Sequence, residues 1–258
     1  MRKVPEELLA CPIWVTFENG SSGTGVFFDI GEIMFLVTAK HVLFKDEKLR
    51  GESCRLICQT RVSEDDDVKI FRTEFNELNV FHAKNQDIAC IEIGRHVDGK
   101  LHCTKGTKVE HENKLNTTGM YLHHCNLIDE AYVGNEVYVF GYPTSIGLKR
   151  LPQFDYNKPL VRKGIISGIY KSKETLIIDS AVYYGNSGGP VIMADPVEGG
   201  DIHYKIIGIV TEFIPYEEKW INPVNNLTNL YHYNSGYAVV IPVDSILSLL
   251  SSKGYEIK

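Results

Sequence analysis

The sequence has no long apolar run. Its most apolar stretches, such as Ile33–Val37, have the length of one β-strand, whereas a membrane-spanning helix needs about 20 residues. We also expect no export signal, because Glu6 and Glu7 interrupt any apolar segment behind the basic residues 2 and 3, and no small-residue cleavage site follows. We therefore expect a soluble, cytoplasmic protein.

Charge of one sign is not concentrated anywhere. The formal net charge of -6 comes from 27 Lys and Arg against 33 Asp and Glu, which are scattered along the chain. Proteins that bind nucleic acid or anionic membranes show a basic patch or stripe. We expect neither kind of partner.

The cysteines lack the spacing of metal sites. The six cysteines are dispersed, no C-x-x-C pair or H-E-x-x-H motif occurs, and 258 residues can build a core without disulfides, so we predict free thiols. A bunch of histidines and cysteines leaves zinc as an alternative, but without ligand spacing we expect no metal and no cofactor. The bunch comprises His102, Cys103, His111, His123, His124 and Cys125.

What the chain does contain is about a dozen short β-type runs separated by turn residues, which is typical of an all-β barrel or sandwich pair. The last two runs are Tyr204–Thr211 and Gly236–Ile241. Helical patterns occur only at the ends, as one turn at Pro5–Ala10 and as a C-terminal helix that Asp244 would cap.

Three motifs place reactive side chains at the ends of apolar runs. His41 follows one such run, Asp87 precedes another, and Ser187 lies among three glycines in Tyr183–Val191. Each alone has an ordinary interpretation as a surface histidine, a capping aspartate or a turn serine. Together, the chain order His, Asp, Ser is one of those known for serine-triad enzymes.

The stretches TAKH (38–41), QDIA (86–89) and GNSGGP (185–190) resemble the signatures of the chymotrypsin-like (trypsin-like) serine protease superfamily, closest to HtrA-type (DegP-like) protease domains. Stretches 133–143, 164–169, 179–181 and 237–243 are similar to the same family, in the same order. The resemblance implies an all-β fold of two packed antiparallel six-stranded β-barrels with a short C-terminal helix. A single peptidase domain over 1–258, without a PDZ domain, would comprise a first barrel at about 10–100, a connection with an inserted loop at about 101–130, a second barrel at about 131–243 and the helix at about 244–252.

The resemblance also implies a serine endopeptidase, a hydrolase that works through an acyl-enzyme. His41 is then the base, Asp87 orients it, Ser187 is the nucleophile, and the backbone N–H groups of Gly185 and Ser187 form the oxyanion hole. Protein or peptide substrates are the expected partners, and a regulatory partner or a homo-oligomer stays open.

The family pattern places the substrate pocket near Ala181, Tyr183, Tyr184, Thr211 and Gly236, with Ala181 as its floor and with walls from the 209–213 segment and Gly236. No acid stands at 181, so we expect cleavage after small or medium aliphatic residues. The Thr211 hydroxyl could bond Asp87, or Thr211 could be an ordinary β-branched strand residue. Asn186 replaces the aspartate that digestive proteases use for zymogen activation, which argues against that route. The alternative function is a protease-fold binding or regulatory module that is inactive or needs a partner for activation.

Overall fold

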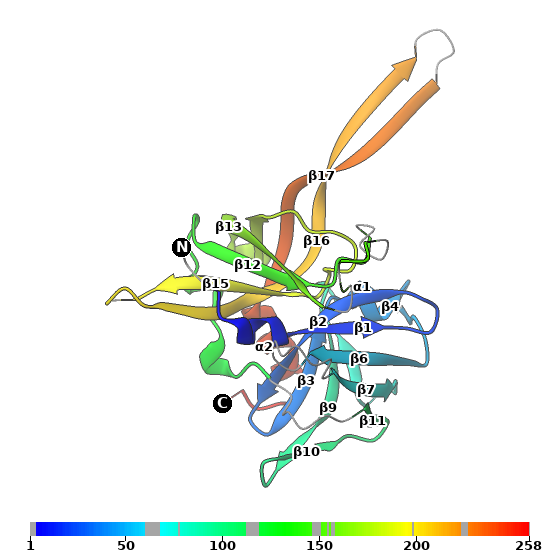
Figure 1. The fold of residues 1–258 in the computed structure, drawn as a ribbon, viewed down its shortest axis with the longest axis vertical. Helices are drawn as coiled ribbons and strands as arrows, with labels where there is room; N and C mark the ends of the chain where they lie inside the picture. Colours follow the sequence, from blue (N-terminus) through cyan, green and yellow to red (C-terminus); the bar gives the residue numbers. More distant parts are fainter. Residues whose placement is uncertain are drawn as a thin grey trace.

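The chain forms two curled antiparallel sheets that pack against each other (Figure 1). A computed structural model describes residues 4–59, 68–76, 78–111, 119–145, 151–153, 155, 158–197, 199–222 and 227–257. The prediction of an all-β, chymotrypsin-like two-barrel fold with one short C-terminal helix is confirmed. In the part of the chain with described placement, no helix is long and apolar enough to cross a bilayer.

The first sheet is built by the N-terminal half in the order β10-β9-β3-β2-β1-β6-β7-β11, with β8 beside β9. Its strands are β1 (Pro12–Thr16), β2 (Ser22–Ile30), β3 (Ile33–Thr38), β6 (Ser53–Gln59), β7 (Val68–Glu74), β8 (Val80–His82), β9 (Ala89–Val97), β10 (Lys100–Cys103) and β11 (Thr107–His111). The short strands β4 (Phe44–Lys45) and β5 (Lys48–Leu49) pair separately.

The second sheet is a closed six-stranded barrel in the order β12-β13-β14-β17-β16-β15. Its strands are β12 (Glu136–Gly141), β13 (Leu160–Tyr170), β14 (Thr175–Asp179), β15 (Pro190–Pro196), β16 (Ile202–Asn222) and β17 (Leu227–Pro242). The helical elements are α1 (Lys40–Leu43), α2 (Val243–Ser252), η1 (Glu6–Ala10), η2 (Leu122–His124), η3 (Ile128–Glu130) and η5 (Lys171–Lys173).

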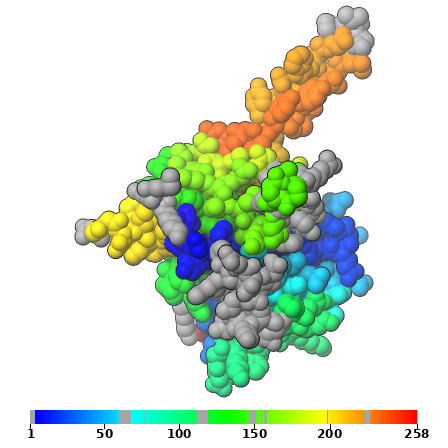
Figure 2. Space-filling view, in the orientation of Figure 1, coloured from blue at the N-terminus to red at the C-terminus, as the bar shows by residue number. Residues whose placement is uncertain are grey.

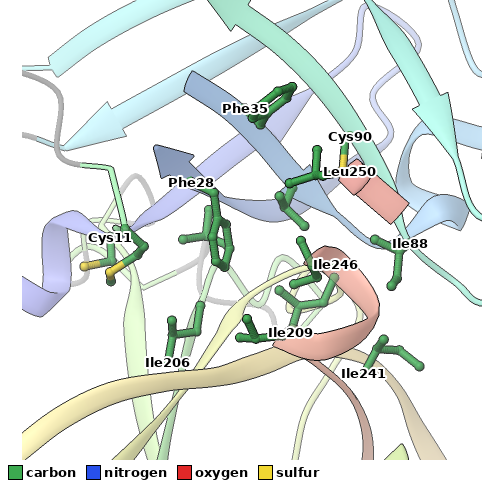
Figure 3. Close-up of a cluster of buried hydrophobic side chains, with 14 of the residues drawn as sticks. Cys11, Phe28, Phe35, Ile88, Cys90, Ile206, Ile209, Ile241, Ile246 and Leu250 are labelled. Atoms are coloured by element: carbon green, nitrogen blue, oxygen red, sulfur yellow. The ribbon is translucent and has the colours of Figure 1, made fainter. Parts of the chain in front are cut away.

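A shared core joins the two sheets. Neighbouring residues of a strand point to opposite faces, so Phe27 packs inside the first sheet while Phe28 packs toward the second barrel. Figure 3 shows the joint, which contains Phe28 and Phe35 from the first sheet, Ile206, Ile209 and Ile241 from the second barrel, and Ile246 and Leu250 from α2. Burying each such side chain contributes about 1.5–3 kcal/mol. The joint therefore holds the halves in one arrangement.

The helix α2 does not begin as predicted. It starts at Val243 after Pro242, and no side chain caps it. The Asp244 carboxylate instead accepts a hydrogen bond at 2.9 Å from the backbone N–H of Ile128 in η3. Asp244 thus ties the helix to the connection between the halves, a contact that local capping rules do not predict.

The strands β16 and β17 are much longer than predicted. The strand β16 runs far past Thr211, and β17 begins far before Gly236. Together they form a hairpin that projects from the barrel (Figures 1 and 2). The missed segment mixes charges, asparagines and Pro215 among its β-prone residues. Its apolar and polar residues do not alternate regularly, so the usual strand signal is weak there.

Candidate active site

His41 lies just behind the end of β3, on the one-turn helix α1. The turn is held because Val42 and Leu43 are buried in the core of the first sheet, while the His41 side chain stays 46% exposed. Arg50 adds support from outside, since its Nε donates to the His41 carbonyl at 2.8 Å. The strand end and the buried turn thus present the imidazole at the surface.

Asp87 reaches His41 from the loop between β8 and β9. Its Oδ2 lies 2.6 Å from His41 Nδ1, and its Oδ1 accepts the backbone N–H of His41 at 2.9 Å. A carboxylate can only accept, so Nδ1 carries the proton and Nε2 is left with a free lone pair. The two contacts fix both the tautomer and the orientation of the ring.

Ser187 lies in a tight turn between β14 and β15 that Asn186 organises. The Asn186 Oδ1 accepts the backbone N–H of Tyr183 at 3.0 Å, and the backbone N–H of Asn186 donates to the Tyr183 carbonyl at 2.9 Å. Asn186 is buried, so water does not compete for these two hydrogen bonds, and they hold the shape of the turn. The turn continues into the second barrel, where Gly188 N–H donates to Val210 O at 2.7 Å.

Two glycines of this turn have backbone geometry that other residues resist. Gly185 has φ +100°, and a Cβ there would lie 2.2 Å from the Tyr142 carbonyl oxygen. Gly188 has φ +84°, and its Cβ would lie 2.0 Å from the Thr24 carbonyl oxygen. Within the described residues, neither Gly185 N–H nor Ser187 N–H donates to a protein acceptor. Both donors are thus available to a ligand.

Thr24 holds the serine turn from the first sheet, a role that sequence reasoning missed. Its Oγ1 donates to Gly185 O at 2.6 Å and accepts Tyr142 N–H at 3.1 Å, while its backbone N–H donates to Ser187 O at 2.9 Å. The available signal was the Gly-Thr-Gly triplet 23–25. A Cβ at Gly23 would lie 2.6 Å from the Val42 side chain, so the triplet marks close packing.

Gln86 ties the aspartate loop to the second half and was also missed. Its Nε2 donates to Glu174 Oε2 at 2.6 Å and to Ser245 Oγ at 2.8 Å. Ser245 is buried in α2 and donates to the same Glu174 oxygen at 3.0 Å. Gln86, which directly precedes Asp87, is thereby anchored both to the turn before β14 and to the C-terminal helix α2.

A cleft of about 820 Å³ between the two halves brings together His41, Asp87 and Ser187. Of the predicted pocket residues, Tyr183, Tyr184 and Thr211 line this cleft, whereas Ala181 and Gly236 are not among its described lining residues. The lining residues that the prediction did not name include Arg50, Val182 and Pro215, whereas Glu212 and Phe213 belong to the 209–213 segment that it placed in the pocket wall.

Aromatic contacts shape one side of the cleft. The Tyr184 ring meets the Phe213 ring edge-on, with centroids 5.7 Å apart, and the Arg162 guanidinium lies 4.7 Å from the Tyr183 ring centre. The Thr211 hydroxyl donates to Val239 O at 3.5 Å instead of contacting Asp87. The interpretation of Thr211 as an ordinary strand residue fits this geometry better.

The histidine and cysteine bunch does not converge on a metal position. Among the described residues, no three His, Cys, Asp or Glu side chains are grouped to hold an ion. The rings of His123 and His124 lie 4.0 Å apart and are tilted by 56°, and burial, with the neighbouring His123, lowers the pKa of His124. All six cysteines are free thiols.

Comparison with known proteins adds the family. A family model described as a trypsin-like peptidase domain matches residues 23–196. The chain belongs to this trypsin-like peptidase family. No curated protein sequence matches the chain.

Similar solved structures include an HtrA-type protease. The serine endoprotease from Yersinia pestis is 16% identical with a TM-score of 0.50, and covers 98% of this chain. The HtrA-type protease AlgW with a tripeptide is 17% identical with a TM-score of 0.51 over 96%, and Deg5 is 17% identical with a TM-score of 0.51 over 94%. The chain spans 67%, 63% and 88% of those three chains, respectively. At such low identity the likeness concerns the fold.

Proposed function

We propose that this trypsin-like peptidase is a serine endopeptidase whose catalytic residues are His41, Asp87 and Ser187. The observation that carries the proposal is the double contact of Asp87 with the His41 ring and backbone, at 2.6 and 2.9 Å, beside a cleft that Ser187 also lines. Serine is a weak nucleophile, and a base with its orienting carboxylate is what activates it.

In the proposed mechanism, His41 Nε2 takes the Ser187 hydroxyl proton while Ser187 Oγ attacks the substrate carbonyl carbon. The Nδ1–H stays bonded to Asp87, which stabilises the imidazolium. His41 then gives the proton to the leaving amine, and the acyl-enzyme forms. In the second step His41 takes a proton from the water that attacks the acyl carbon, and returns it to Ser187 Oγ as the C–O bond breaks and the acid leaves.

The free N–H groups of Gly185 and Ser187 are the proposed oxyanion donors. The peptide that carries the Gly185 N–H has Tyr184 O as its carbonyl, which accepts from Ser145 Oγ at 3.3 Å. The next peptide is held as well, since Gly185 O accepts from Thr24 Oγ1 at 2.6 Å. Losing one such donor costs about 3 kcal/mol in the transition state. This argument supports a turn that is already set for catalysis, without zymogen-type activation.

The proposed preference for small or medium aliphatic residues before the cut rests on the lining of the cleft, since Ala181, on which the expectation was based, is not among its described lining residues. The Tyr184 and Phe213 rings narrow the cleft, and protein substrates are the partners we propose. Glu212 also lines the cleft, so a basic residue beside the aliphatic one is compatible with it.

The test is digestion of a proteome-derived peptide library by wild type and by Ser187→Ala, together with labelling by a fluorophosphonate probe. We expect cleavage and labelling only with wild type, and the cleavage sites report the pocket preference. Labelling that survives Ser187→Ala would remove Ser187 from the mechanism. A wild type that neither labels nor cleaves supports the alternative of an inactive or partner-dependent module.

A further inference from the structure

Beyond the barrel, β16 and β17 continue as a two-stranded hairpin, which we call the arm (residues 212–222 and 227–236). Figure 2 shows it projecting from the body of the molecule. The strand β15 pairs with β16 only up to Ile209, and β14 pairs with β17 only over residues 237–240. Over its described length, the arm's two strands pair only with each other.

One face of the arm is aromatic. Tyr216 lies opposite Tyr233, Glu218 opposite Tyr231 and Trp220 opposite Asn229, and directly opposite residues share a face. The aromatic face therefore consists of Tyr216, Trp220, Tyr231 and Tyr233. Their exposed fractions are between 47% and 61%, and the Tyr231 and Tyr233 rings stack at 6.3 Å.

The exposed aromatic face of the described arm is suited to binding another polypeptide. A two-stranded hairpin alone is marginally stable in water, and a third strand or a covering chain stabilises it. Clustered exposed apolar side chains mark interaction sites. The opposite face is different, since Glu217 and His232 pair there at 3.3 Å.

Charge selects the occupant. The charged residue on the aromatic face is Glu218, and Glu212 stands at the root of the arm, whereas Glu217 and Lys219 stand on the opposite face. Lys and Arg are attracted both to carboxylates and to Trp and Tyr ring faces. A second acidic arm or an anionic lipid surface would meet repulsion. The complement is an extended polypeptide segment that alternates basic and apolar side chains.

The arm is continuous with the cleft. Its root residues Glu212, Phe213 and Pro215 line the cleft. Asn234 Nδ2 donates to the carbonyl of Val182, another lining residue, at 2.5 Å, and Ser235 Oγ donates to Ile214 O at 2.5 Å. A polypeptide that leaves the cleft along β16 therefore meets the aromatic face next.

We propose that the arm is a substrate exosite, which binds an extended, basic and apolar segment of the protein substrate beside its scissile bond. The identification of the bound segment as part of a substrate rests on the proposed peptidase function. The binding itself is independent of catalysis. The aromatic face holds the segment, and the cleft receives the bond to be cut.

The binding test uses the full chain with Ser187→Ala and a fluorescein-labelled peptide of alternating Arg and Val. We expect saturable binding by fluorescence anisotropy, lost when Tyr216→Ser, Trp220→Ser and Tyr233→Ser are combined. The matched control combines Ile221→Ser and Leu230→Ser on the opposite face and should bind as before. A Glu-Val peptide that binds equally well overturns the charge argument.

The kinetic test compares a short substrate that fills only the cleft with the same substrate extended by the Arg-Val segment at either end. The triple variant should lower kcat/KM about tenfold for one extended substrate and leave the short one and fluorophosphonate labelling unchanged. The exosite proposal is overturned if the ratio of kcat/KM for the extended substrate to that for the short one is the same in wild type and in the triple variant, and the peptide does not bind. A wild type that cleaves nothing yet binds Arg-Val refutes only the peptidase proposal. The exosite proposal would also be overturned if the arm bound anionic vesicles, or dimerised in sedimentation experiments, and did not bind the peptide.

Discussion

The hydroxyl of Thr24 donates to the carbonyl of Gly185 at 2.6 Å, across 161 residues of sequence. The bond connects β2 of the first sheet with the serine turn of the second barrel. The same Thr24 oxygen accepts the Tyr142 N–H, and the Thr24 backbone N–H donates to Ser187 O. One buried residue therefore bonds two residues of the serine turn and the neighbouring Tyr142. The position of the proposed nucleophile thus depends on the joint between the halves.

Thr24→Val should impair both stability and turnover. The substitution keeps the shape but leaves Gly185 O and Tyr142 N–H buried without their partner, at a cost of about 1–3 kcal/mol. We expect a lower urea midpoint and slower fluorophosphonate labelling. Thr24→Ser keeps the hydroxyl and is the control. A Val variant that labels as fast as the Ser variant would show that the hydroxyl does not position the turn.

Asp87→Asn should leave the fold intact and nearly abolish catalysis. The amide can still accept the backbone N–H of His41, but its NH2 group would face Nδ1 and force the proton onto Nε2, where the base is needed. Loss of about 10³–10⁴ in the labelling rate is expected from the wrong tautomer. The measurement is the labelling rate, with circular dichroism as the check of folding. A decrease of less than tenfold would contradict the assigned role of Asp87.

The local parts of this site were predictable from sequence, and the long-range parts were not. His41, Asp87 and Ser187 each stand at the end of an apolar run, where strand pattern and turn chemistry can be recognised within a few residues. Thr24 and Gln86 act through partners more than 80 residues away. Such contacts arise only when the two halves pack, so a single sequence carries little sign of them.

The arm was missed for a different physical reason. Strand prediction relies on alternation between a buried and a solvated face. In the described arm neither face is buried: Tyr216 and Trp220 are more than half exposed, and Glu217 and Lys219 stand between them. Backbone pairing with β17 stabilises these residues as strand without the usual apolar pattern.

Gln86→Met should slow catalysis through Asp87 rather than through substrate binding. Methionine keeps the length of the side chain but cannot donate to Glu174 and Ser245, so the aspartate loop loses its anchor to the second half. We expect kcat for a short peptide to fall about tenfold, as for a loss of about 1.4 kcal/mol, with little change in KM. Lys84→Met, in the same loop and exposed, is the matched control. A rise in KM at constant kcat would instead indicate that Gln86 acts on substrate binding.

Cys11 should resist alkylation while the protein is folded. Burial raises the pKa of its thiol to about 12, and only the thiolate reacts, so at pH 8 the reactive fraction is about 10⁻⁴. In the unfolded chain the same thiol has an ordinary pKa and full access to the reagent. We expect iodoacetamide at pH 8 to modify Cys11 quickly in urea and hardly at all in buffer, as followed by peptide mass spectrometry. Equal rates in the two conditions would mean that η1 and β1 open readily, because Cys11 stands between them and is buried in the joint core.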